Sequence, residues 1–296
     1  MTPVIIEAAV NGATPKSRNP HVPTAPDEIA REALACMRAG AAIVHNHIDD
    51  FSLGGVEAAE RYLAGWRPVV RERPDAILYC TVALGGSIEA RYAHVPPLGA
   101  SGLMRMSVLD PGSVNLGSAG DDGLPGGFDF VYSHSYADVR YVVQQLEEHR
   151  LGPSISIFEP GFLRTALVYH RQRRLPRGAF VKLYFGGDAS YLGGGSSGVT
   201  FGLPPTAKAL DAYLEMLDGC ELPWAVAVIG GDVVACGLAR TALERGGHVR
   251  VGLEDYAGAR TPSNVELVEE VVAVAKRVGR PIASPAEAAK LLGLPR

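Results

Sequence analysis

Short apolar runs alternate with segments of helical character along this chain of 296 residues, and the alternation limits the folds open to it. Each run has the length of a buried strand, and apolar residues recur at helical spacing between most of the runs. Strands are expected at residues 4–10, 41–47, 76–82, 103–109, 152–158, 180–185, 224–229 and 248–253. Because no Ser/Pro-rich linker divides this pattern, it predicts an α/β chain forming one closed (β/α)8 TIM barrel, a single domain over residues 1–296.

Start and stop signals locate the helices of this barrel. Thr24 is expected to cap the first helix and Gly40 to end it. Ser284, followed by Pro285, marks the start of the last helix. The other helices are expected at residues 56–73, 135–149, 162–171, 206–217, 234–245 and 264–278.

Composition narrows the class of partner. Hydrophobic residues make up 47% of the chain, enough for a large core. The formal net charge of -4, without a block of like charges, favours neither nucleic acid nor a membrane surface, so small-molecule partners are expected. No basic leader or long apolar segment is present, which indicates a soluble intracellular protein. The four cysteines are widely separated, which indicates a reducing cytoplasm and neither a disulfide framework nor a cysteine zinc site: Cys36, Cys80, Cys220 and Cys236.

The second strand ends in a His-x-His pair. Alternate residues of a strand point to the same face, so His45 and His47 project to one side. Two imidazoles at this spacing suit a borderline metal such as zinc, but a third ligand is needed, and two ordinary polar residues at a strand end would look the same.

The eighth strand offers the third ligand. Arg250 and Glu254 share a face of that strand, with Gly252 leaving space between them. Closure of the barrel places strand eight beside strand one and strand one beside strand two, so Glu254 and the histidines converge at the catalytic end. Two histidines and one carboxylate leave open positions on a metal ion, as in a catalytic site. The simpler alternatives are a solvated acidic loop for Glu254 and Asp255, and a structural ion pair between Arg250 and either carboxylate.

Three segments together resemble one known family. They are Val4–Thr14 with Ile-Glu-Ala-Ala-Val-Asn-Gly, Ala39–His47 with the His-x-His pair, and Gly246–Asp255 with Gly-Gly-His-Val-Arg-Val-Gly-Leu-Glu-Asp. This combination resembles the β-keto acid cleavage enzymes over nearly the whole chain. The resemblance implies a zinc-dependent TIM barrel, usually an oligomer and with a homotetramer favoured, that converts a β-keto acid and acetyl-CoA into acetoacetate and a new acyl-CoA.

The resemblance also implies roles for individual residues. His45, His47 and Glu254 would be the zinc ligands. Arg250 and Asp255 would assist proton transfer, with the arginine charge expected to keep the pKa of Asp255 low. Thr81 matches the hydroxyl that the family places at the end of strand three.

Two positions depart from the family pattern. Thr14 stands where the family has a glutamate in the loop after strand one, and Glu7 is the candidate to replace that carboxylate. Tyr256 stands where the family commonly has asparagine after Glu-Asp, which would reshape the pocket rim.

The glycine-rich loop of residues 186–198 follows strand six. Glycines let backbone N–H groups approach phosphates, so Gly193, Gly194 and Ser196 are candidates to bind the CoA pyrophosphate, although a lid would have the same composition. Three single histidines are expected to be structural: His94, His134 and His170.

Strand five bears on the substrate. Its alternating polar positions, Ser154 and Ser156, are hydroxyls, and no carboxylate comes before Glu159 at the strand end. An ammonium group out of water needs a carboxylate partner, so an uncharged keto acid side chain is expected. The residues leave two other functions open, namely a metal-dependent aldolase or hydrolase on the same barrel, and a metal-binding barrel without catalysis.

Overall fold

An eight-stranded parallel sheet forms the centre of the computed structural model, which describes residues 1–189 and 201–295. Around the sheet the strand order is β3-β2-β1-β10-β9-β8-β7-β4. The ring closes between its two end strands, where Leu78 and Met104 form a parallel bridge and the Arg105 N–H donates to the Leu78 carbonyl over 3.3 Å. The strands are β1 (Ile6–Ala9), β2 (Ile43–Asn46), β3 (Ile77–Cys80), β4 (Met106–Leu109), β7 (Gly152–Ile157), β8 (Phe180–Gly186), β9 (Trp224–Ile229) and β10 (His248–Val251).

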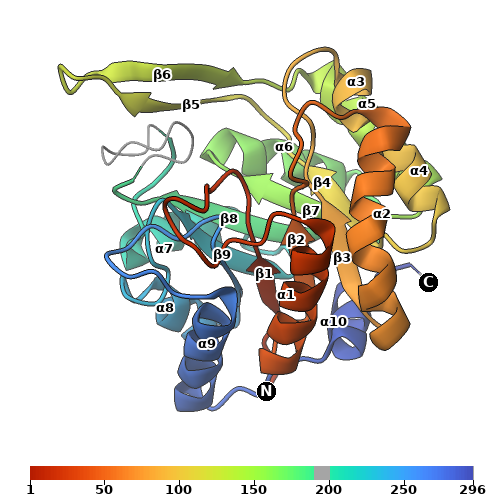
Figure 1. The fold of residues 1–296 in the computed structure, drawn as a ribbon. Coiled ribbons are helices and arrows are strands. Elements are labelled where there is room, and N and C mark those ends of the chain that lie inside the picture. Colours follow the sequence, from red (N-terminus) through yellow and green to blue (C-terminus); the bar gives the residue numbers. More distant parts are fainter. Residues whose placement is uncertain (190–200, 296) are drawn as a thin grey trace.

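Helices surround this barrel (Figure 1) and cover the outer face of the strands, while the inner face lies inside the barrel. The apolar strand residues form the core. The predicted TIM barrel is therefore confirmed, with all eight expected strands present. The helices are α1 (Pro26–Ala39), α2 (Gly55–Glu72), α3 (Ile88–Tyr92), α4 (Val95–Ala100), α5 (Tyr136–Glu148), α6 (Pro160–Arg171), α7 (Ala207–Met216), α8 (Leu238–Glu244), α9 (Asn264–Val278) and α10 (Pro285–Leu292).

The segment between β4 and α5 contains an element that the sequence pattern does not predict. It is an antiparallel hairpin of β5 (Val114–Ala119) and β6 (Pro125–Tyr132), which extends away from the barrel at the upper left of Figure 1. The two short helices α3 and α4 are likewise not predicted. All three elements lie in the connections on either side of β4, where glycines and prolines obscure the period of the pattern.

Helix boundaries follow the start signals with two exceptions. Ser284 caps α10 as expected, accepting a hydrogen bond from the Glu287 N–H over 3.3 Å. Thr24, however, precedes the N-cap of α1, which is Ala25, and the Glu28 carboxylate accepts from both of their N–H groups. Helix α8 begins later than expected because Gly237 adopts the left-handed conformation, with φ of 82°, at its N-cap.

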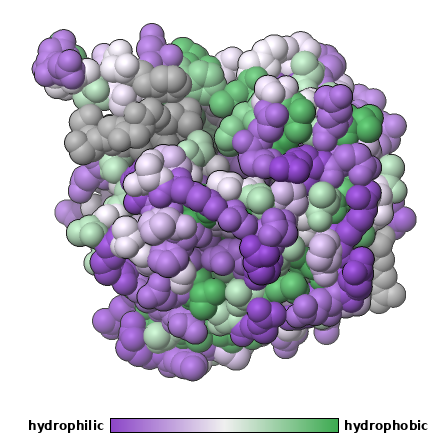
Figure 2. Space-filling model, in the orientation of Figure 1, coloured by the Kyte–Doolittle hydropathy of each residue, from purple (hydrophilic) through white to green (hydrophobic). Residues whose placement is uncertain are grey.

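One side of the outer surface can be described by its hydropathy. Figure 2 shows this side of the molecule as largely hydrophilic, with hydrophobic residues in small separate patches. In the part of the chain that the structure describes, no helix is both long enough and apolar enough to cross a membrane.

Candidate functional site

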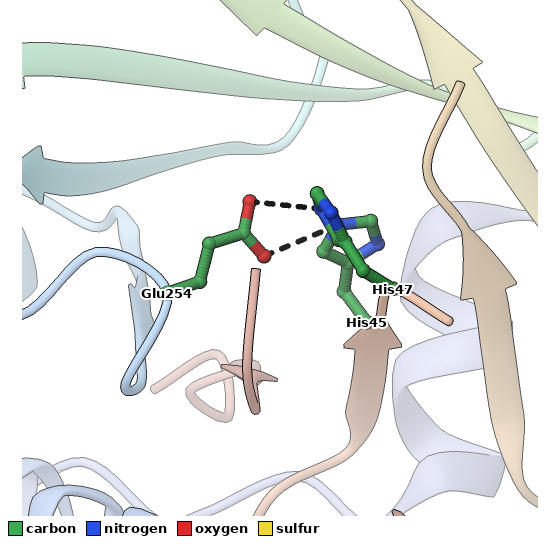
Figure 3. A group of neighbouring side chains, drawn as sticks. All are labelled: His45, His47 and Glu254. Atoms are coloured by element: carbon green, nitrogen blue, oxygen red, sulfur yellow. Dashed lines mark ion pairs between the residues drawn. The ribbon is translucent and has the colours of Figure 1, made fainter. Parts of the chain in front are cut away.

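His45, His47 and Glu254 converge at one end of the barrel, as predicted. His45 lies on β2, His47 follows it, and Glu254 follows β10. The Glu254 carboxylate points at both imidazoles (Figure 3), with Oε2 at 3.3 Å from His45 Nε2 and Oε1 at 3.4 Å from His47 Nε2. One potential ligand atom from each residue lies within 4.8 Å of the other two. We refer to these three residues as the metal-ligand group.

The protonation of this group suits a metal ion. Burial lowers the pKa of His45 well below its usual range, which keeps the imidazole neutral and able to coordinate. Burial alone would raise the pKa of Glu254, but the charge of Arg250 holds it well below its usual range, so the carboxylate is ionised. His47 Nε2 is buried and makes no hydrogen bond with the described residues. Buried nitrogen and oxygen donors that face one another in this way fit zinc.

Two asparagines hydrogen-bond to the backbone beside the metal-ligand group. Asn11 accepts from the His47 N–H over 2.8 Å and donates to the His47 carbonyl over 3.0 Å. Asn264 accepts from the Leu253 N–H over 2.9 Å. Thr14, the residue in place of the family glutamate, donates its hydroxyl to the Leu253 carbonyl over 2.8 Å. Thr14 therefore fixes the backbone next to Glu254.

Gly252 permits a close approach of β10 to β1. Its φ is +149°, and a Cβ atom built there would lie 2.1 Å from the Ala9 carbonyl oxygen. The space expected at Gly252 between Arg250 and Glu254 is not present. Instead, those two side chains are in contact, with Arg250 Nη2 at 2.9 Å from Glu254 Oε1.

Arg250 also forms a two-point ion pair with Asp255. Its Nε donates to Asp255 Oδ2 over 2.8 Å and its Nη2 to Oδ1 over 3.0 Å. The expectation of a low pKa for Asp255 is wrong, because burial raises that pKa more than the arginine lowers it. Both ion pairs considered from the sequence are present.

A second group of charges lies directly beneath the metal-ligand group. Tyr79 donates to Glu7 Oε1 over 2.5 Å, and Lys182 Nζ donates to Tyr79 Oη over 2.6 Å and to Glu7 over 3.3 Å. Arg250 Nη1 completes the group, 3.1 Å from Glu7 Oε1. We call Glu7, Tyr79, Lys182 and Arg250 the basal cluster. Burial would raise the pKa of Glu7, but the charges of Lys182 and Arg250 lower it, so Glu7 is the anion that balances two buried cations.

A pocket opens above these groups. The metal-ligand group, Thr81, Lys182 and Arg250 all line it. Glu7 and Asp255 are buried behind the lining. Gly193, Gly194 and Ser196, the candidates for the CoA pyrophosphate, lie outside the described residues.

The sequence pattern did not single out three polar residues of this pocket. Tyr79 and Lys182 are in the middle of apolar strands, and the lysine inside such a strand was the available signal. Asp110 follows β4 and also lines the pocket, but in the sequence it begins an Asp-Pro-Gly turn, which conceals its role. Of the three single histidines, His94 is structural, with Nε2 at 2.8 Å from the Thr81 carbonyl oxygen.

Comparisons with known proteins point to one family. A family model described as beta-keto acid cleavage enzyme matches residues 3–294. The 3-keto-5-aminohexanoate cleavage enzyme of Fusobacterium nucleatum is 30% identical over 300 residues, which cover 99% of each chain. The 3-oxoadipate:acetyl-CoA acetyltransferase of Cupriavidus necator is 27% identical, over 99% of this chain and 95% of that protein.

Among solved structures, the apo structure of ObcA superposes with a TM-score of 0.67 at 20% sequence identity. The match covers 94% of this chain and 66% of ObcA, so this chain spans slightly less than two thirds of that protein. At this identity the likeness shows a shared fold.

The basal cluster predicts a large stability cost when its anion is removed. Glu7→Gln keeps the shape but leaves Lys182 and Arg250 without that negative charge, so the free energy of unfolding should fall by about 3–5 kcal/mol. The pKa of Glu7 is lowered from 4.5 in the folded state, so the difference from wild type should be complete above that pH and shrink as the pH falls. Urea unfolding at several pH values measures this difference in the free energy of unfolding. The exposed Glu57→Gln variant, the matched control, should stay within about 0.5 kcal/mol of wild type, and equal stability of the two variants would contradict the account.

Proposed function

The chain belongs to the beta-keto acid cleavage enzyme family, and on that premise we propose that it is a zinc-dependent acyltransferase. It converts a β-keto acid and acetyl-CoA into acetoacetate and a new acyl-CoA. The acyl group of the keto acid leaves as its CoA thioester, and the acetyl group takes its place, so atoms balance without a further reactant.

One observation carries the proposal. His45, His47 and Glu254 meet within 4.8 Å at the mouth of a barrel whose sequence matches the family over residues 3–294. In a (β/α)8 barrel this end of the strands is where catalytic groups lie.

We assign the zinc ion to the metal-ligand group. When bound, zinc supplies a positive charge that stabilises negative charge developing on oxygen atoms of the keto acid. The lowered pKa of His45 keeps this imidazole neutral, and the lowered pKa of Glu254 keeps the carboxylate ionised, which are the forms that coordinate a metal.

The proposed roles of the other residues follow from where they lie. Arg250 lines the pocket, and its fixed positive charge would act on negative charge that develops on the keto acid beside the metal-ligand group. Asp255 holds that guanidinium at two points, and its raised pKa brings it closer to the range of a proton acceptor. Thr81 presents a hydroxyl on the same wall. Glu7 lies between the two cations Lys182 and Arg250, so we assign it to holding them rather than to proton transfer.

Three wider assignments complete the proposal. The loop with Gly193, Gly194 and Ser196 would bind the CoA pyrophosphate, as expected from its glycines. The family resemblance favours a homotetramer. The four cysteines are free, which fits a reducing cytoplasm.

The zinc assignment predicts about one zinc ion per chain in the purified protein. His47→Ala removes one ligand and should reduce bound zinc to a small fraction of that amount. The single histidine His170, on α6, supplies the control, because His170→Ala should retain the full amount. Metal analysis of the three proteins checks this, and equal zinc in His47→Ala and wild type would remove the ligand assignment.

The proposed reaction predicts that acetoacetate and acyl-CoA form in equal amounts from a β-keto acid and acetyl-CoA. Asp255→Asn should lower kcat by about 10²–10⁴-fold while zinc stays bound, because this residue acts on protons and on Arg250 rather than on the metal. A screen of β-keto acids with and without acetyl-CoA measures both quantities.

The other two functions have distinct outcomes in this screen. Keto acid consumption without CoA would indicate an aldolase or hydrolase, and no turnover in any condition would indicate a barrel that only binds metal. Unchanged turnover in Asp255→Asn would exclude this residue from the mechanism.

A further inference from the structure

Asp110 is a buried carboxylate that the reaction described above does not use. It follows β4, is 5% exposed, and lines the pocket. Tyr132, from β6 of the hairpin, donates its hydroxyl to Asp110 Oδ2. The other oxygen, Oδ1, is buried without a hydrogen-bond partner among the described residues. A buried carboxylate oxygen in this state is costly, so its place in a binding pocket indicates that a ligand supplies the partner.

The ring of strands places Asp110 across the pocket from the metal-ligand group. Between β10 and β4 stand the strands β9, β8 and β7 in one direction, and β1, β2 and β3 in the other. The end of β4 therefore lies diametrically opposite the end of β10, which carries Glu254. A substrate whose keto acid end lies at the metal-ligand group would extend its side chain towards Asp110.

Two cations near Asp110 donate hydrogen bonds to other groups. Lys182 Nζ is bound to Tyr79 and Glu7. Arg91 donates to the Ser133 carbonyl and lies 3.9 Å from an Asp138 oxygen. In the described part of the chain, neither lysine nor arginine supplies the hydrogen bond that Asp110 Oδ1 lacks.

The surroundings of Asp110 strengthen its attraction for a cation. The rings of Tyr132 and Phe158, which line this side of the pocket, are 6.1 Å apart, and Phe130 lies 6.3 Å from Tyr132. Aromatic walls exclude water, which increases the strength of a charge pair, and their faces attract cations.

We propose that Asp110 is the specificity residue of this enzyme and selects a β-keto acid whose side chain carries an ammonium nitrogen with an N–H group. The proposal rests on the proposed function, because it names the substrate class for that site. The two relatives above are named for keto acids of opposite side-chain character, one with an amino group and one with a second carboxylate, so comparison alone leaves this choice open.

The inference replaces the expectation of an uncharged substrate. That expectation considered only β7, where Ser154 and Ser156 are hydroxyls and Glu159 lies at the strand end. The Glu159 carboxylate accepts a hydrogen bond from the Gly202 N–H, with 2.8 Å between Oε1 and N, and Glu159 does not line the pocket. The carboxylate comes from β4 instead.

Three six-carbon keto acids test the inference with wild-type enzyme. The side chain of 3-keto-5-aminohexanoate carries an ammonium group. The side chain of 3-oxohexanoate is uncharged, and that of 3-oxoadipate carries a second carboxylate. We expect kcat/KM for the amine to exceed that for the neutral acid by about 10- to 100-fold, with 3-oxoadipate lowest. A fourth substrate, 3-dehydrocarnitine, carries a cationic group without an N–H. Its kcat/KM should lie between the values for the amine and for the neutral acid. A neutral or anionic preference overturns the inference.

Asp110→Asn keeps the shape and removes the charge. In this variant, kcat/KM for the amine should fall to within a few-fold of kcat/KM for 3-oxohexanoate. The value for 3-oxohexanoate itself should change by less than about three-fold. Asp129→Asn, an exposed aspartate on the same hairpin, removes an equal charge outside the pocket and should leave all four substrates unchanged. Equal losses for all substrates in Asp110→Asn would show that Asp110 serves the reaction itself, which overturns the specificity assignment.

Failure of the proposed function can be distinguished from failure of the Asp110 assignment. If the enzyme consumes no keto acid with acetyl-CoA, the function fails, and calorimetric titration of the metal-loaded protein with 5-aminohexanoate and hexanoate still tests the subsite. Binding of 5-aminohexanoate at least 10-fold more tightly than hexanoate supports it, and equal or weaker binding overturns it.

Discussion

The pairing of Arg250 with three buried carboxylates is the interaction on which the rest of the site depends. Its guanidinium contacts Glu7, Glu254 and Asp255, and all four groups are buried. Because a buried charge without a partner is strongly destabilising, none of these groups can be removed without cost to the others. One arginine thereby joins the barrel floor to the proposed metal ligands and fixes the position of both.

The barrel brings together residues that are distant in sequence. β1 pairs with β2 on one side and β10 on the other, so Glu254 meets histidines about two hundred residues away. Glu254 and Asp255 follow β10, and Asp110 follows β4 on the opposite side of the ring, at the same end of the barrel. A ligand lying between them would meet positive charge from Arg250 and the proposed zinc at one end and a carboxylate at the other.

Patterns of period two and the order of strands in a closed barrel were sufficient to predict the fold and the convergence of His45, His47 and Glu254. They could not identify Lys182 and Asp110, because one is a single polar residue inside an apolar strand and the other begins what reads as an ordinary turn. The raised pKa of Asp255 also depends on tertiary structure, since the competition between burial and Arg250 follows from how far the pair is from water. The hairpin of β5 and β6 was missed because its glycines obscure strand alternation.

Metal dependence of the complete reaction is the decisive measurement for zinc held by His45, His47 and Glu254. Zinc would be removed with a chelator and then restored, while acetoacetate and acyl-CoA are measured from one β-keto acid and acetyl-CoA. The account predicts that both products disappear together without zinc and return together, in equal amounts, when zinc is added back. Undiminished formation of acyl-CoA in the metal-free protein would contradict it.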